Sequence, residues 1–288
     1  MKSVKKYLSF VKFSHTIFAL PFALIGFFLA TQYAHYTLDW LVFVYVVLCM
    51  VFARNAAMAF NRYVDRDIDR LNPRTKQREI PAGKISEKSA LFFVILNSIL
   101  FIATTWFINK LVFFLSPVAL LVVLGYSYTK RFTALCHLVL GLGLALAPIG
   151  AYLSVTAQFA VLPAVFSFIV LFWTSGFDII YALQDDEFDK NHDLNSIPAY
   201  LGKKKALILS AFLHFIVALL IIWAGIYAGF GWWYWIGAVI FIVLLVYQHS
   251  IVKIDDLSKV NLAFFTTNGI ASVVFAVFTI LELFLDKF

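Results

Sequence analysis

The chain has 288 residues, of which 62% are hydrophobic and only 14% are charged, and its formal net charge is +7. A soluble globular domain averages roughly 45–50% apolar and 25% charged residues, so the composition excludes an ordinary soluble protein and predicts a polytopic membrane protein. Cys49 and Cys136 lie in or beside apolar runs and indicate neither a disulfide framework nor a metal-ligand cluster.

A membrane-spanning helix needs about 20 mostly apolar residues, and nine segments of the chain meet this criterion. We therefore predict an all-α fold with nine transmembrane helices. The predicted spans lie near residues 13–33, 40–60, 90–108, 111–127, 135–154, 160–183, 206–228, 232–249 and 260–284.

Basic residues are distributed unequally between the two sides of the predicted membrane. If the amino terminus is cytoplasmic, all but three of the 23 lysines and arginines lie in cytoplasmic segments; the exceptions are Lys110, Lys287 and Arg54. This bias follows the positive-inside rule. It predicts a multi-pass protein of the cytoplasmic membrane, and it accounts for the positive charge without a nucleic-acid partner.

The stretch 61–69 directly follows the apolar run 40–60 and carries the first acidic motif. Asn61, Asp65 and Asp69 are spaced four residues apart, and each step of four drifts only about 40° around a helix, so the three side chains share one face. Carboxylate and amide oxygens are hard ligands, and Mg²⁺ is usually held by one or two carboxylates together with substrate phosphates. The motif therefore predicts half of a magnesium site.

Arginines accompany this motif. Arg54 lies seven residues before Asn61, inside the span, where a guanidinium usually faces the bundle interior or a watery cavity. It either pairs with a motif aspartate or binds phosphate oxygens, and the sequence leaves both open. Arg66 and Arg70 are interpreted as a solvated or lipid-facing stripe, and Asp67 lies on the helical face opposite the acidic ligands.

The fourth span ends with Tyr126, Lys130 and Arg131. An aromatic ring beside two cations suits a cationic intermediate and its departing phosphate. The same pattern is typical of an interfacial aromatic belt with positive-inside charge, so both interpretations stay open. His137, near the start of the fifth span, has no evident partner.

A second acidic motif ends the sixth span. Its members share one helical face and are Asp178, Tyr181, Asp185 and Asp189. Two carboxylate faces on two helices suggest paired metal sites that clamp an anionic group between them, in one central cavity open to the cytoplasm. The remaining acidic residues of this loop are interpreted as solvated charges: Asp186, Glu187 and Asp193.

The two motifs together resemble those of the UbiA superfamily of intramembrane prenyltransferases, and the resemblance covers residues 1–288 as a single domain. The sequence of residues 12–23 resembles that of one branch of the superfamily, the 4-hydroxybenzoate polyprenyltransferases and their menaquinone-pathway relatives. Two positions depart from the family pattern. Arg62 stands where many members carry a further aspartate, and Asn195 stands where many carry a basic residue.

The resemblance implies magnesium-dependent transfer of a polyprenyl group from a polyprenyl diphosphate to an aromatic acceptor such as 4-hydroxybenzoate, in quinone biosynthesis. No obligatory protein partner is implied. The implied metal ligands are Asn61, Asp65, Asp69, Asp185 and Asp189, of which the four aspartates are the catalytic candidates. The implied substrate contacts are Arg54, Tyr126, Lys130, Arg131, Asp178 and Tyr181.

Other functions are compatible with part of this pattern. Within the superfamily, dihydroxynaphthoate, haem, chlorophyllide, glycerophosphate and ribose-phosphate acceptors remain open. An ion-coupled transporter would also carry intramembrane carboxylates, but transporter sites usually lie near the midplane on interrupted helices, whereas these acids cluster at one face. A phospholipid head-group phosphotransferase is disfavoured because the expected Asp-x-x-Asp-Gly opening is absent.

Overall fold

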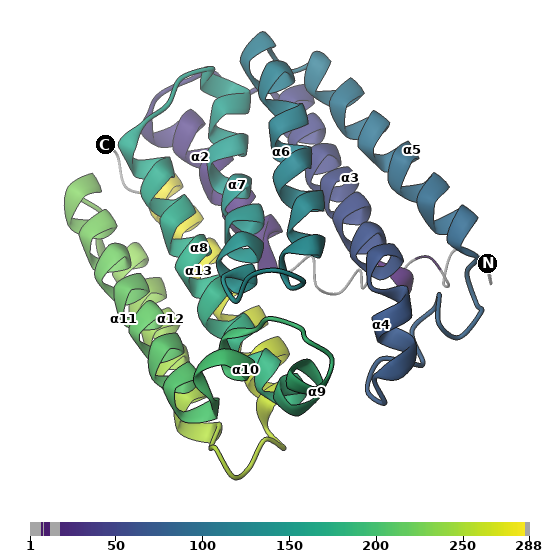
Figure 1. Ribbon diagram of the computed structural model, residues 1–288. Helices are drawn as coiled ribbons and strands as arrows, with labels where there is room; N and C mark the ends of the chain where they lie inside the picture. The colour runs from purple at the N-terminus through teal and green to yellow at the C-terminus, as the bar shows by residue number, and fades with distance from the viewer. Residues whose placement is uncertain (1–6, 8, 12–17, 286–288) are drawn as a thin grey trace.

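The computed structural model describes residues 7, 9–11 and 18–285, and the helices in this part of the chain form one bundle (Figure 1). The all-α prediction is confirmed: apart from a single isolated bridge between Lys253 and Asp256, the regular structure of the described residues is helical. The α-helices are α2 (Leu20–Phe28), α3 (Trp40–Val64), α4 (Arg66–Leu71), α5 (Glu87–Trp106), α6 (Lys110–Thr129), α7 (Cys136–Thr156), α8 (Val161–Ala182), α9 (Asp186–Asn191), α10 (Ile197–Leu201), α11 (Lys203–Ala228), α12 (Trp232–Ile251) and α13 (Asn268–Leu285).

Eight helical segments of the described residues are long and apolar enough to cross a membrane, and they coincide with predicted spans two to nine. At the place of the first predicted span lies a shorter apolar helix, in which α2 continues as the π-helical segment Leu29–Tyr33. Residues 13–17 of that span lie outside the described part of the chain. The last span likewise combines the π-helical segment Leu262–Thr267 with α13.

Helix boundaries follow local chemistry at the two tightest joints. Asn109 separates α5 from α6, and its side-chain oxygen accepts a hydrogen bond from the backbone N–H of Val112 at 2.9 Å, which satisfies one of the free donors of the first turn. Gly229 ends α11 with φ of 67°, a left-handed conformation that glycine adopts without a side-chain penalty.

Small residues bring the central helices into close contact. A Cβ atom added at Gly141 of α7 would lie 2.4 Å from the backbone oxygen of Leu171 in α8, and one added at Gly26 of α2 would lie 2.0 Å from the oxygen of Pro148 in α7. Membrane helices lack a hydrophobic drive to associate, so such close backbone approach supplies much of their packing energy. These contacts fix α7 between α2 and α8.

A buried polar network ties α8 to the three last long helices. Trp173 Nε1 donates to Asn268 Oδ1 at 2.8 Å, Asn268 Nδ2 donates to Gln248 Oε1 at 3.1 Å, and Gln248 Nε2 lies 3.2 Å from His214 Nδ1. His249 joins the network through a 2.8 Å contact to His214. Because these polar groups satisfy one another within the bundle, the network specifies how the helices pack.

Candidate active site

The first acidic face lies where α3 passes into α4. The helix is interrupted at Asp65, whose φ of −87° and ψ of 4° leave the helical region, so Asn61 and Asp69 belong to two successive helices and not to one continuous helix. The backbone hydrogen bonds from Asp65 N–H to Asn61 and from Asp69 N–H to Asp65 persist across the joint. The predicted common face is therefore kept, and Asn61 Nδ2 donates to Asp65 Oδ2 at 2.9 Å.

The second acidic face lies at the corresponding end of α8. This helix ends at Ala182 and continues through a short 3₁₀ turn, Leu183–Asp185, into α9. Asp178 and Tyr181 are in α8, Asp185 ends the turn, and Asp189 is in α9 with no exposed surface. In Figure 1, α4 and α9 extend from the same end of the bundle.

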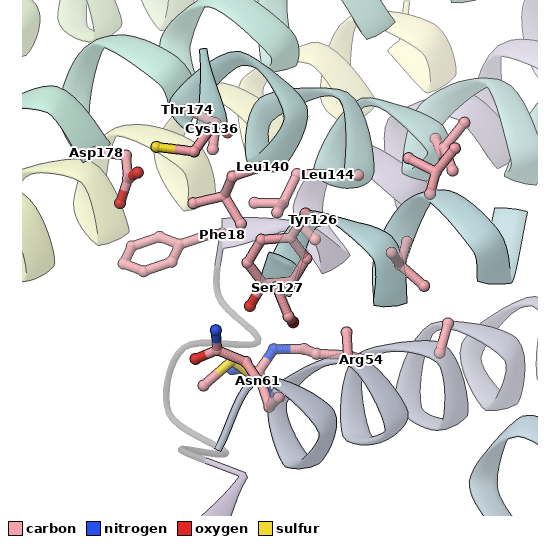
Figure 2. A pocket seen from close by; sticks show the side chains of 18 of the residues that line it. Phe18, Arg54, Asn61, Tyr126, Ser127, Cys136, Leu140, Leu144, Thr174 and Asp178 are labelled. Carbon is pink, nitrogen blue, oxygen red and sulfur yellow. The ribbon is translucent and has the colours of Figure 1, made fainter. Parts of the chain in front are cut away.

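Both faces line one cavity of about 920 Å³, so the structure brings together all the residues that the sequence proposed for the site. Figure 2 shows Arg54 and Asn61 on one side of this cavity, Asp178 on the other side, and the ring of Tyr126 between them. The lining includes every sequence-predicted site residue, namely Arg54, Asn61, Asp65, Asp69, Tyr126, Lys130, Arg131, Asp178, Tyr181, Asp185 and Asp189.

Each of the four carboxylates spaced for metal binding forms an ion pair with a cation of the cavity wall. The pairs are Asp65 with Arg131 (3.1 Å), Asp69 with Arg78 (2.7 Å), Asp185 with Arg74, and Asp189 with Lys130 (2.7 Å). The contact between Lys130 and Asp189 is an ion pair without hydrogen-bond geometry. Both buried oxygens of Asp189 therefore accept no hydrogen bond from the described residues. A buried carboxylate without a compensating charge is strongly disfavoured, and these cations supply that charge.

The donor set fits Mg²⁺ held together with a phosphate ligand. Its oxygens are carboxylate and amide, which this hard cation prefers. No three His, Cys, Asp or Glu side chains of the described residues are close enough to form a metal site by themselves. Such an arrangement is expected for Mg²⁺, which is usually bound by one or two carboxylates plus substrate phosphates and not by an all-protein cage.

Loop residues that the sequence did not single out complete the second face. Arg74 Nε donates to Asp185 Oδ1 at 2.9 Å and Arg74 Nη1 donates to the Tyr181 hydroxyl at 2.7 Å, while Asn72 Nδ2 donates to Asp185 Oδ1 at 3.0 Å. The loop after α4 therefore reaches across the cavity and joins the two acidic faces. Only the density of basic residues after Asp69 pointed to this loop.

Burial and pairing shift two pKa values in this region. Burial raises the pKa of the Asp65 carboxyl above its ordinary value, although the neighbouring Arg131 favours the charged form. Burial lowers the pKa of Arg74, but its hydrogen bonds to Asp185 and Tyr181 outweigh that effect and leave the pKa above its usual range. The Arg74 guanidinium thus stays charged beside its carboxylate.

Asp178 is held by a residue for which the sequence gave no partner. His137 Nε2 accepts a hydrogen bond from the backbone N–H of Ile197 at 3.3 Å, so the proton on Nδ1 points to Asp178 Oδ2 at 2.7 Å. His137 is buried, whereas the Asp178 side chain is 21% exposed and lines the cavity. The pair joins α7 to α8, and nothing in the spacing of the two residues could have predicted it.

The structure bears on the sequence interpretations of Asp186 and Arg54. Asp186 is not a solvated loop charge: it is 5% exposed and lies 3.4 Å from Lys203 and 3.5 Å from Lys190, because α9 folds back against the start of α11. Arg54 Nη1 donates to the Val11 carbonyl at 3.1 Å, and the ion pairs of the four motif aspartates are made by Arg131, Arg78, Arg74 and Lys130.

The cavity changes from polar to apolar along the bundle. From the acidic faces it continues between α3, α6 and α7 as far as Val46 and Leu153, and Val46 lies 15 residues before Asn61, about 22 Å along a helix. Val118 and Phe159 line it and are 58% and 66% exposed, so the cavity reaches the outer surface of the bundle.

Comparison with known proteins assigns this architecture to a class. The model of the UbiA prenyltransferase family matches residues 19–270. The chain belongs to this family and is a multi-pass membrane prenyltransferase. The family and the enzyme class that the two motifs predicted are thus confirmed.

Individual relatives agree with the family assignment. The chain is 30% identical over 236 residues to a 4-hydroxybenzoate octaprenyltransferase of Cupriavidus pinatubonensis, which covers 80% of this chain and 82% of that protein. It is 29% identical over 228 residues to the enzyme of the same name from Francisella tularensis, covering 79% of this chain and 80% of the relative. These names associate the family with polyprenyl transfer.

Solved structures show the same fold. An apo UbiA homologue from Aeropyrum pernix aligns with a TM-score of 0.81 and 29% identity, covering 95% of this chain and 98% of that one. A UbiA homologue from Archaeoglobus fulgidus, solved with GPP and Mg²⁺, aligns with a TM-score of 0.75 and 21% identity, covering 96% and 99%.

Proposed function

We propose that this prenyltransferase catalyses Mg²⁺-dependent transfer of a polyprenyl group from its diphosphate to an aromatic acceptor of the 4-hydroxybenzoate type, as a step of quinone biosynthesis. The observation that carries the proposal is the meeting of two acidic faces, from α3–α4 and α8–α9, across one cavity. The names of the octaprenyltransferase relatives support the acceptor class, and the Archaeoglobus structure with GPP and Mg²⁺ supports the metal and the donor.

Asn61, Asp65 and Asp69 on one side, and Asp185 and Asp189 on the other, are the proposed Mg²⁺ ligands. When bound, Mg²⁺ would neutralise the diphosphate and stabilise it as a leaving group. The cations now paired with the four aspartates lie beside this position. Arg74 and Lys130 are proposed to donate N–H groups to diphosphate oxygens as the carboxylates take up metal.

Residues next to the acidic faces are proposed to control the transfer itself. The allylic C–O bond breaks, the acceptor ring forms a C–C bond to the allylic carbon, and one ring proton leaves. Tyr126 lines the cavity, and the face of its ring attracts a cation. Asp178, oriented by His137, is proposed to accept the ring proton. The apolar lining excludes water, which would otherwise capture the carbocation.

The apolar extension of the cavity is proposed to hold the polyprenyl tail. It runs about 22 Å along α3 and reaches exposed Val118 and Phe159. A tail of several isoprene units can therefore enter from the bilayer while its diphosphate remains at the polar end. The excess of basic residues in one set of loops supports an active site on the cytoplasmic side of the cytoplasmic membrane.

The proposed activity is tested with membranes that contain the protein, a labelled polyprenyl diphosphate and 4-hydroxybenzoate. We expect a prenylated product in Mg²⁺, none in EDTA, and loss of product in Asp65→Ala and Asp185→Ala proteins that still insert. Unchanged turnover in both variants would contradict the metal assignment. A panel of naphthoate, tetrapyrrole, glycerophosphate and ribose-phosphate acceptors separates the related activities.

The transporter alternative makes a different prediction. A prenyltransferase releases diphosphate in detergent solution when both substrates are present, and it moves no substrate across liposomes. Substrate flux in liposomes without diphosphate release would favour transport over group transfer.

A further inference from the structure

Arg62 is a buried cation that the reaction described above does not use. It lies in the last turn of α3, is 5% exposed and lines the active-site cavity. Its Nε and Nη1 atoms are shielded from solvent and have no hydrogen-bond partner among the described residues. Nor does Arg62 belong to any ion pair in that part of the chain. A guanidinium is always charged, so its burial needs compensation.

The neighbouring acidic groups are engaged elsewhere. Asp69 accepts two hydrogen bonds from Arg78 and Glu79 accepts one from Ser9, and neither carboxylate accepts a hydrogen bond from Arg62 or lies within ion-pair distance of it among the described residues. Arg78 is itself a repulsive neighbour of Arg62. The fold therefore leaves the Nε and Nη1 donors of Arg62 without an acceptor.

An anion bound by Arg62 would lie on the α3 side of the cavity. Arg62 belongs to α3 and Tyr126 to α6, and both residues line the cavity, whereas Asp185 and Asp189 approach it from the end of α8 and from α9. A diphosphate that bridges the two acidic faces lies between them, with Arg74 and Lys130 close at hand. An anion at Arg62 would instead lie at the α3 wall of the cavity, which the Tyr126 ring also lines.

We propose that Arg62 binds the anionic group of the acceptor and thereby selects negatively charged aromatic acceptors over neutral ones. The inference rests on the proposed function, because it takes the second substrate to be an aromatic anion. A carboxylate suits the planar, bidentate guanidinium, and the Tyr126 ring offers a stacking surface to the acceptor ring. Arg62 is thus a specificity-determining residue of the acceptor site.

Binding without turnover tests the proposal. The affinities of the purified protein in detergent for 4-hydroxybenzoate and for its neutral analogue 4-hydroxybenzamide are measured by calorimetry. We expect the wild type to prefer the anion by roughly ten- to a hundredfold, the range of a charge-assisted hydrogen bond. Arg62→Met should remove the preference, and Arg62→Lys should restore part of it.

Two controls separate this role from others. Arg70→Met removes a cation of the adjoining helix α4 that is 52% exposed and paired with Asp67 and Glu87, and it should keep the wild-type preference. Binding of Mg²⁺ with inorganic pyrophosphate should be unchanged in Arg62→Met. The thermal midpoint of Arg62→Met without ligands should equal or exceed that of the wild type, because an uncompensated charge has been removed.

Three results would overturn the proposal. The first is a wild type that does not prefer the anion, or an Arg62→Met protein that still does. The second is an Arg62→Met protein that loses pyrophosphate affinity alone, since the anion would then be the diphosphate. The third is a fall of about 5 °C or more in the ligand-free midpoint, which would mean a structural role. If binding of the aromatic anion depends on Arg62 but no prenylated aromatic product forms, the proposed function fails and Arg62 remains an aromatic-anion site without a role in acceptor selection.

Discussion

At the scale of single residues, each of the four motif carboxylates forms an ion pair with a cation of the cavity wall. Asp189 has no exposed surface, and Lys130, 35% exposed, lies 2.7 Å from it. A metal ion that binds the Asp189 carboxylate must displace the Lys130 ammonium group from it. Lys130 then becomes available to an anion. The same exchange applies to Asp69 and Arg78. Binding of metal and binding of diphosphate should therefore favour one another.

The Lys130–Asp189 pair predicts a stability effect in the metal-free protein. Lys130→Met leaves a buried carboxylate without its cation, which should lower the free energy of unfolding by on the order of 3 kcal/mol. Thermal unfolding in EDTA measures the effect. Lys190→Met is the matched control, because its partner Asp186 keeps Lys203, and it should change stability by less than about 0.5 kcal/mol. Equal effects of the two variants would refute the pairing.

Asp65 predicts a dependence of stability on pH. Its pKa in the folded protein is raised by burial, so the folded state prefers the protonated carboxyl. Its contribution to stability is therefore complete below the pKa of the unfolded chain and is lost as pH rises through the folded pKa. As pH rises through this window, the thermal midpoint of the metal-free wild type should fall relative to that of Asp65→Asn. A difference between the two proteins that is constant with pH would contradict the assignment.

At the scale of helices, close packing of α7 on α8 positions the His137–Asp178 pair. Gly141 lies four residues after His137, about one helical turn, and its added Cβ would meet the backbone oxygen of Leu171. A side chain at this position must push the helices apart, and the hydrogen bond between His137 and Asp178 would then lengthen.

Alanine substitutions in α7 test this packing. Gly141→Ala should destabilise the protein by about 1–3 kcal/mol through overpacking and should lower turnover. Gly150→Ala, in the same helix, places its Cβ in open space and should be neutral or stabilising by up to about 1 kcal/mol. Thermal unfolding and product formation are measured for both. Similar losses in the two variants would show that the close contact at Gly141 is not responsible, because alanine has the higher helix propensity at both positions.

Sequence patterns predicted the elements better than the contacts between them. Apolar runs predicted the spans because a membrane helix carries its signal in its own length, as the agreement at 109–110 and 229–231 shows. Spacing of four residues predicted that Asn61, Asp65 and Asp69 share a cavity, because that relation is local. The contact of His137 with Asp178 joins two helices and the burial of Asp186 depends on α11, so neither was visible in local spacing.

At the scale of the whole molecule, charge asymmetry predicts orientation. Exposed Lys76 lies in the loop after α4, and Lys110 begins α6 at the opposite end of the bundle. In a protein with Cys49 and Cys136 replaced by serine, Lys110→Cys should react with a membrane-impermeant maleimide in intact cells. Lys76→Cys should react only after permeabilisation. The reverse pattern would place the acidic faces outside the cytoplasm.

Both acidic faces are proposed to hold one diphosphate through bound metal. The most direct measurement is the affinity of the purified protein for a non-reactive prenyl thiodiphosphate, with and without Mg²⁺. We expect binding that requires Mg²⁺ and is lost in Asp69→Ala and equally in Asp189→Ala, although these residues lie on different helices. Tight binding without a divalent ion, or binding that survives the loss of either face, would contradict it.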